Sequence, residues 1–142
     1  MRFMMLMIPK VYNTSAAPTD HLDPEAMKRM MKYNEDLTKA GVLLALDGLH
    51  PPAAGVRVTY PGGKPKVQDG PFSEAKEVVG GYWVIQVKSK EEAVEWARRI
   101  PANEGDTVEL RQVFEISEFP AEVQKVAEGS SVQSHLKKLG QR

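Results

Sequence analysis

The sequence predicts a single α+β domain in which two helices pack on one face of an antiparallel sheet. Three observations predict it: short apolar or alternating segments typical of strands, two amphipathic segments with good helix caps, and the alternation of these segments along the chain. A length of 142 residues fits one domain, and 42% of hydrophobic residues is enough to bury a core.

The first half of the chain predicts a strand, a helix and a second strand. Phe3–Ile8 is short, apolar and ended by Pro9, which suits a strand buried on both faces. A helix is expected to begin at Asp23–Glu25, because Asp is a good N-cap and Pro suits the first helical position. Gly41 stands where a glycine C-cap belongs, and Val42–Leu46 is apolar enough for the next strand.

One face of this first helix is expected to pack on the sheet. Its apolar positions follow the three- and four-residue spacing of a helix, whereas its charged residues lie elsewhere. Methionine fills irregular gaps in a core well. We therefore expect one buried face formed by Met27, Met30, Met31, Asn34 and Leu37.

A small hairpin is expected to follow. Val56–Tyr60 alternates apolar and polar residues, as a half-exposed strand does, and Lys66–Gln68 returns after a Pro-Gly-Gly turn. Asp69–Pro71 is a further turn, since Asp and Gly favour turns and Pro restricts the backbone beside them. Ser73–Val78 fits a single helical turn capped by its serine.

The second half of the chain repeats the order of strand, helix and strand. Tyr82–Val87 is rich in aromatic and β-branched residues, and its first two residues are expected on opposite faces of the sheet. Ser89–Glu92 is a capping box that opens a helix ending near Ile100. Thr107–Ile116 is the last strand, and its inward residues are expected to be Val108, Leu110, Val113 and Phe114.

The order of these elements predicts a ferredoxin-like βαββαβ fold with a hairpin insertion. Two βαβ units with right-handed crossovers place both helices on one face of the sheet. The other face still needs a cover, for which a second sheet is the usual solution. We therefore expect a homodimer in which two sheets close face to face; the C-terminal tail is the alternative cover.

The chain divides into a domain at residues 1–116 and a tail at residues 117–142. The tail follows a complete set of strands and helices, and it contains two weak helical stretches, Ala121–Ala127 and Val132–Leu139. We expect the fold to form without the tail, and the tail to support the dimer or to cover the rim of the space that the two sheets would enclose.

Charge and composition exclude several classes of function. Nineteen Lys and Arg balance nineteen Asp and Glu, so direct nucleic-acid binding through a broad basic face is not expected. The chain has no cysteine, which removes disulfides, thiolate nucleophiles and cysteine metal sites. The apolar run at the N-terminus is too short for a secretory leader or a membrane span, so we expect a cytoplasmic protein without membrane contact.

Neither a metal nor an organic cofactor is expected. His21, His50 and His135 are far apart, and no pair has the helical spacing of a metal site. Gly62–Lys64 places a lysine after two glycines but lacks the spacing of a phosphate-binding loop. A catalytic step would therefore depend on side chains alone.

His50 is the best candidate for acid–base chemistry. Free imidazole titrates at about pH 6.5, and a nearby carboxylate raises its pKa and holds one tautomer. Asp47 lies three residues before it, and Asp69 is expected across the hairpin. We interpret His50 and Asp69 as catalytic candidates and Asp47 as a ligand contact. In the alternative, His50 only caps a strand end before two prolines.

Residues after the turn at 69–71 are candidates for ligand binding. A rigid turn would present Phe72 to a pocket, Tyr82 would add an apolar wall, and Lys76 would bind an anionic group. The alternative is a purely structural turn, with Lys76 in a solvated charge pair of little energetic value.

Several segments resemble the YCII-related proteins that carry a DGPF motif, a group of small bacterial proteins. The resemblance rests on Asp69–Glu77, Gly80–Tyr82, Ala40–Leu44 and Gly48–Pro52, where glutamine is common in place of His50. It covers Arg2 to Ile116 in the expected order. The resemblance implies a dimeric α+β barrel, and most members have no assigned activity.

The resemblance leaves two functions open. Some members lie near, or are fused to, extracytoplasmic-function sigma factors, which implies a regulatory module linked to transcription. Another branch pairs an early helix histidine with an aspartate for acid–base work, but Met30 stands near that position here, so this dyad does not carry over. The chain is thus either a cofactor-independent enzyme acting on a small molecule or a non-enzymatic binding module.

Overall fold

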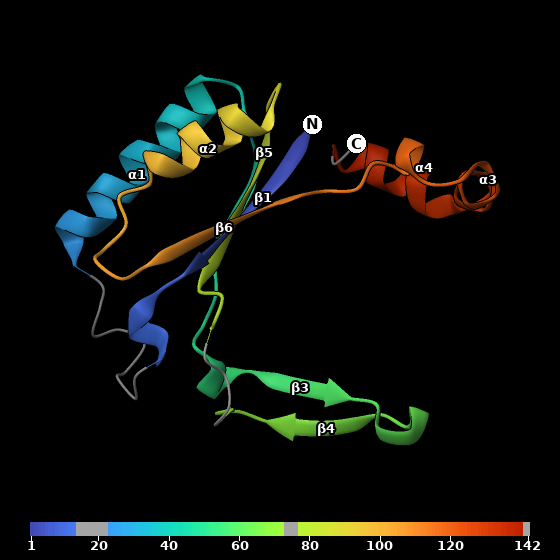
Figure 1. The fold of residues 1–142 in the computed structure, drawn as a ribbon, viewed down its shortest axis with the longest axis horizontal. Helices are drawn as coiled ribbons and strands as arrows, with labels where there is room; N and C mark the ends of the chain where they lie inside the picture. Colours follow the sequence, from blue (N-terminus) through green and yellow to red (C-terminus); the bar gives the residue numbers. More distant parts are fainter. Residues whose placement is uncertain (14–22, 73–76, 141–142) are drawn as a thin grey trace.

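A four-stranded antiparallel sheet forms the centre of the fold (Figure 1). Its strand order is β2-β5-β1-β6, and adjacent strands in it are antiparallel. The strands are β1 at Arg2–Ile8, β2 at Leu43–Gly48, β5 at Gly81–Gln86 and β6 at Thr107–Gln112. This computed structural model describes residues 1–13, 23–72 and 77–140, so the turn expected at 73–78 lies largely outside the described residues.

Two helices cover one face of this sheet, α1 at Pro24–Lys39 and α2 at Lys90–Arg98 (Figure 1). Both begin as predicted. The Asp23 carboxylate caps α1 by accepting hydrogen bonds from backbone N–H groups of its first turn, and the Ser89 hydroxyl caps α2 in the same way. The predicted α+β class with an antiparallel sheet is therefore confirmed.

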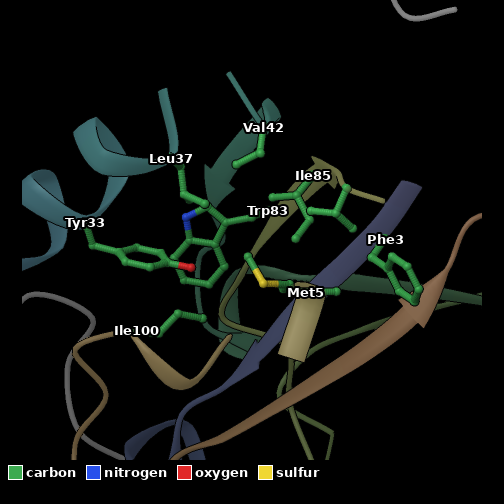
Figure 2. Close-up of a cluster of buried hydrophobic side chains, with 10 residues drawn as sticks. Phe3, Met5, Tyr33, Leu37, Val42, Trp83, Ile85 and Ile100 are labelled. Atoms are coloured by element: carbon green, nitrogen blue, oxygen red, sulfur yellow. The ribbon is translucent and has the colours of Figure 1, made fainter. Parts of the chain in front are cut away.

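The core lies between the two helices and the sheet (Figure 2). Its buried residues are Phe3, Met5, Tyr33, Leu37, Val42, Trp83, Ile85, Val87, Ala93 and Ile100. The prediction that the first strand is buried on both faces is wrong. In β1 only Phe3 and Met5 are buried, because a layer covers one face of the sheet and alternate side chains point to the other.

Two methionines of α1 lie beside the core rather than inside it. Met27 is 48% exposed and Met31 is 52% exposed, whereas Met30 packs against the core. The predicted burial of all three is therefore wrong. Tyr33 and Leu37 occupy the centre of the buried helix face, and the helical spacing places Met27 and Met31 to one side of it.

A hairpin and a C-terminal helix pair project from the other side of the sheet (Figure 1). The hairpin consists of β3 at Val56–Thr59 and β4 at Lys66–Asp69, as predicted, and forms a two-stranded sheet of its own. The helix pair is α3 at Ala121–Glu128 and α4 at Ser131–Lys138. Within the described ranges, no helix is long and apolar enough to cross a membrane.

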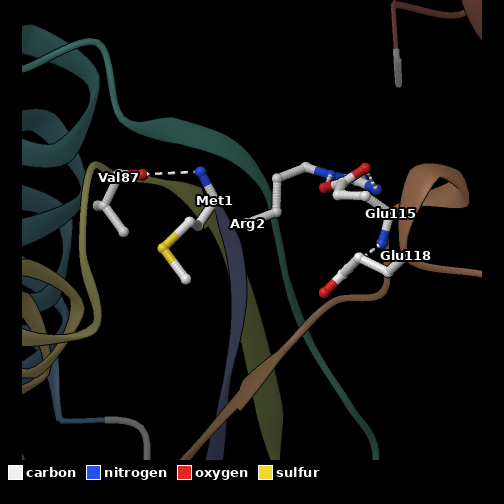
Figure 3. Close-up of polar contacts among 5 residues, drawn as sticks. All are labelled: Met1, Arg2, Val87, Glu115 and Glu118. Carbon is white, nitrogen blue, oxygen red and sulfur yellow. Dashed lines mark hydrogen bonds and ion pairs between the residues drawn. The ribbon is translucent and has the colours of Figure 1, made fainter.

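The last strand ends earlier than predicted, at Gln112. Phe114 is 68% exposed and packs on the ring of Phe119, with ring centroids 5.3 Å apart, so its predicted inward position is wrong. The chain turns away here because Glu115 is bound from two sides (Figure 3). Its carboxylate accepts two hydrogen bonds from Arg2, at 2.7 and 3.1 Å, and its backbone N–H donates to Glu118.

The sheet face opposite α1 and α2 remains open, and the described sheet does not close into a barrel. Cross-strand pairs on this face include Met4 with Val84 and Leu6 with Tyr82. The end of α4 reaches the face, since Leu139 and Gly140 line a pocket of about 370 Å³ together with these strands. Within one chain, most of this apolar face therefore lacks a second layer among the described residues.

Candidate functional site

A pocket of about 310 Å³ lies where the hairpin joins the sheet, and we call it the hairpin pocket. It is lined by residues 49–52, 54–57, 72 and 77–79. Two of the predicted site residues, His50 and Phe72, are among them. The pocket therefore combines the segment that follows β2 with the segment that follows the turn at 69–71.

The turn at 69–71 requires a glycine at position 70. Its backbone N–H donates to the Gly55 carbonyl at 2.8 Å, which holds the end of the hairpin against its beginning. A Cβ at this position would overlap the carbonyl oxygen of Pro52, so only glycine fits the close approach. The turn is thus structural, and its effect is to place Phe72 in the pocket wall.

Arg57 on β3 provides the main cation of the hairpin pocket. Its guanidinium carbon lies 3.9 Å from the centroid of the Phe72 ring, a cation–π arrangement. No carboxylate among the described residues forms an ion pair with it, although Glu77 also lines the pocket. Sequence reasoning missed Arg57, because the alternation in β3 marks it only as an exposed strand residue.

The structure does not bring the two catalytic candidates together in this pocket. His50 lines it, but Asp69 pairs with Val56 at the open end of the hairpin ladder and is not among the lining residues that the structure describes. No hydrogen bond joins His50 to Asp47 or Asp69 within the described part of the chain. Lys76 lies outside the described residues. The catalytic pairing of His50 and Asp69 stays a prediction.

Asp47 and Tyr82 form a pair of their own. The Tyr82 hydroxyl donates to Oδ2 of Asp47 at 2.7 Å, and the two residues are cross-strand neighbours on β2 and β5. This hydrogen bond, followed by the negative charge of Asp47, raises the pKa of the Tyr82 phenol. Trp83 is buried on the helix side, so Tyr82 lies on the open face, which confirms that the two aromatic residues are split between the faces.

A second pocket, of about 290 Å³, lies between α1 and the ends of β2 and β5. We call it the methionine pocket, because Met7, Met27, Met30 and Met31 line it together with Asn34 and Trp83. Asp47, Gly48 and residues 80–82 border it as well. Sequence reasoning missed this pocket, since the helical spacing assigns the methionines of α1 to the core.

One backbone segment separates the two pockets. Gly80 donates its N–H to the Met7 carbonyl at 2.8 Å, and its own carbonyl accepts the N–H of Leu49 at 2.9 Å. Leu49 and Val79 line the hairpin pocket, whereas Met7 and Gly80 line the methionine pocket. Of the predicted site residues, His50 and Phe72 therefore line the hairpin pocket, whereas Asp47 and Tyr82 border the methionine pocket.

The described residues contain no group of three or more His, Cys, Asp or Glu side chains that could hold a metal ion. The hairpin pocket offers an imidazole, a guanidinium, an aromatic ring and the carboxylate of Glu77. The guanidinium of Arg57, which no described carboxylate pairs with, is the group suited to a negatively charged ligand.

Comparison with known proteins gives a family and one distant relative. A family model for the YCII-related domain matches residues 1–117. A protein of Rhizobium meliloti (strain 1021), described as uncharacterised, is 32% identical over 76 residues. The aligned part covers 54% of this chain and 61% of the relative, so it spans less than two thirds of that protein.

Proposed function

The chain belongs to the YCII-related domain family, and we propose that within this domain the hairpin pocket binds a small anionic molecule. The observation that carries the proposal is Arg57, which lies on the Phe72 ring at 3.9 Å. The ring supports one face of the guanidinium and leaves its N–H edge available. That edge matches the two oxygens of a carboxylate.

An aromatic acid fits this pocket best. Phe72 offers a ring, and the prolines at 51 and 52 add apolar wall. His50 lies in the same lining and adds a second nitrogen donor. Lys76, which follows Phe72 by four residues, is proposed as a further contact for the anion.

Catalysis is a second candidate function, because His50 lines the pocket that would hold the ligand. In that case His50 would transfer a proton without a cofactor, and Asp69 would orient the His50 imidazole. The alternative is a non-enzymatic binding or regulatory module linked to sigma-factor-dependent transcription. Both alternatives use the same anion-binding pocket, so ligand binding is the step to test first.

We also propose that the family domain forms a homodimer of ferredoxin-like subunits. The strand order β2-β5-β1-β6 and the two helices on one face support the subunit fold. The open apolar face, with Met4, Leu6 and Val84, supports a second copy as its cover. Two sheets packed in this way would form an α+β barrel.

Isothermal titration with benzoate tests the binding function. Benzoate is expected to bind, and benzamide, its neutral counterpart, is expected to bind at least about tenfold more weakly because it lacks the charge-assisted bonds. Arg57→Gln should remove the benzoate preference. Arg98→Gln is the matched control, since Arg98 lies exposed on α2 away from the pocket. Equal binding of both compounds, or unchanged binding by Arg57→Gln, would contradict the proposal.

A further inference from the structure

We propose that the methionine pocket binds a second kind of ligand, a small uncharged aromatic compound that carries one hydrogen-bond acceptor. The inference does not depend on the hairpin pocket, which lies on the other side of Gly80. It rests on the wall of the pocket, on the side chain of Asn34 and on the charges at the pocket border.

The wall of the pocket is soft and apolar. Met27, Met30 and Met31 contribute to it from α1, and Met7 contributes from β1. Thioether side chains adapt to irregular shapes and make favourable contacts with aromatic rings. Four of them around one space therefore fit a flat ring better than a branched aliphatic group.

A ligand would remove apolar surface of two of these methionines from water. Met27 and Met31 are about half exposed, although the same helix buries Tyr33 and Leu37 further along. Apolar surface removed from water contributes about 25 cal/mol per Å². A ring placed between these side chains removes such surface without any rearrangement of the core, which is centred on Tyr33 and Leu37.

Asn34 supplies one directed polar group. Its Oδ1 accepts the indole N–H of Trp83 at 2.8 Å, which fixes the orientation of the amide. With the oxygen engaged, the amide nitrogen of Asn34 makes no hydrogen bond to a described side chain or backbone group, and solvent reaches it, since no buried polar side-chain atom among the described residues lacks a partner. A carbonyl oxygen on the ligand is the matching group.

The charges at the border exclude an ionic ligand. Asp47 is the only ionisable carboxylate among the described lining residues, and its Oδ2 accepts from Tyr82, which lies on the open sheet face. The part of the lining that the structure describes contains no Lys or Arg. An anion would find no counter-charge there, and a cation would compete with the Tyr82 hydroxyl for the Asp47 carboxylate.

Acetophenone, a ring with one carbonyl, is the probe for this pocket. The protein is labelled with ¹³C at the methionine methyl groups, which gives seven signals from seven methionines. A bound ring is expected to shift the signals of Met7, Met27, Met30 and Met31. The signals of Met1 and Met4 serve as internal references, because neither residue lines the pocket.

Two variants inside the pocket and one outside it test where acetophenone binds. Asn34→Asp keeps an oxygen for Trp83 but removes the donor and adds a charge, so acetophenone affinity should fall about tenfold or more. Met31→Gln, at a half-exposed position that the fold tolerates, should weaken binding through its polar side chain. Arg57→Gln should leave acetophenone binding unchanged.

Three results would overturn the inference. The first is the absence of pocket methyl shifts up to the solubility of acetophenone, and the second is a shift of the Met4 signal in their place. The third is binding of benzoate to the methionine pocket as tightly as acetophenone. Loss of benzoate binding in Arg57→Gln concerns the hairpin pocket alone, so the two proposals succeed or fail separately.

Discussion

Trp83 and Asn34 connect the sheet to its first helix through a single directed bond. The indole Nε1 of Trp83 on β5 donates to Oδ1 of Asn34 on α1 at 2.8 Å. Trp83 is buried, and its ring also packs edge-on against Tyr33 at a centroid distance of 6.0 Å (Figure 2). The bond satisfies the indole donor, which would otherwise be buried without a partner.

Asn34→Ala is expected to lower the free energy of unfolding by about 1–3 kcal/mol, since it leaves the Trp83 N–H without its acceptor. Denaturant unfolding followed by tryptophan fluorescence measures this loss. Asn34→Asp is the matched control because it retains an acceptor oxygen. A loss of equal size in both variants would show that the bond itself contributes little.

Stability is expected to fall at alkaline pH because of Tyr33. Burial raises the pKa of its phenol above the ordinary value of 10.0, and the charge of Arg99 offsets part of this effect. Below about pH 10 the phenol is neutral in both states. At higher pH only the unfolded chain releases the proton, so the free energy of unfolding decreases until the folded-state pKa is reached.

The variant Tyr33→Phe isolates this contribution. Its free energy of unfolding, measured between about pH 9 and 11, is expected to decrease less steeply than that of the native chain, by about 0.7 kcal/mol per pH unit on average. Tyr60→Phe is the control, since Tyr60 is largely exposed on the hairpin side. Parallel curves for the native chain and Tyr33→Phe would contradict the assignment.

Gly70→Ala is expected to displace the hairpin, because a Cβ at this position overlaps the Pro52 carbonyl oxygen. The local cost is about 1–3 kcal/mol, typical of an overpacked site. Faster hydrogen exchange of the residue-70 amide and weaker benzoate binding are the measurements. Gly48→Ala should have little effect, since a Cβ there meets nothing within 4 Å.

Truncation after Pro120 is expected to leave the fold intact. This end point retains Glu115, whose carboxylate binds Arg2, and Glu118, which accepts the Glu115 N–H (Figure 3). Circular dichroism should keep its β-sheet signal and lose only the contribution of α3 and α4. Global unfolding of the shortened chain would move the domain boundary beyond residue 116.

The proposed dimer is expected to dissociate when a charge is placed on the open sheet face. Sedimentation should give twice the 15.8 kDa chain mass for the native protein and a single chain mass for Val84→Glu. Val84 points away from the core, so the subunit should remain folded. A monomeric native protein would exclude a second copy as the cover.

Local signals in the sequence predicted most of the elements. The caps at Asp23 and Ser89 and the alternation in the hairpin strands depend on residues close in the chain, so they could be recognised directly. The burial pattern of β1 could not be predicted in this way, because it depends on which face of the sheet the helices cover. The exposure of Phe114 could not be predicted either, because it follows from the contact between Arg2 and Glu115, which are 113 residues apart.

The candidate site was predicted less completely, for the same reason. His50 and Phe72 line one pocket, but the sequence predicts that they share it with Asp47 and Tyr82, which meet each other on the open face. Arg57 was missed because its contact with Phe72 joins two sides of the hairpin base. Sequence order indicates which residues are near a turn but not which face of it they occupy.

Gly80 has a thermodynamic consequence for the two proposed ligands. Its N–H is held by Met7 and its carbonyl by Leu49, so a single peptide segment borders both binding spaces. A Cβ there would come within 2.6 Å of the Pro9 ring, which leaves the segment little room to move independently. Occupation of one space is therefore expected to leave affinity in the other unchanged, because coupling between two sites requires an element with two arrangements that both ligands bias.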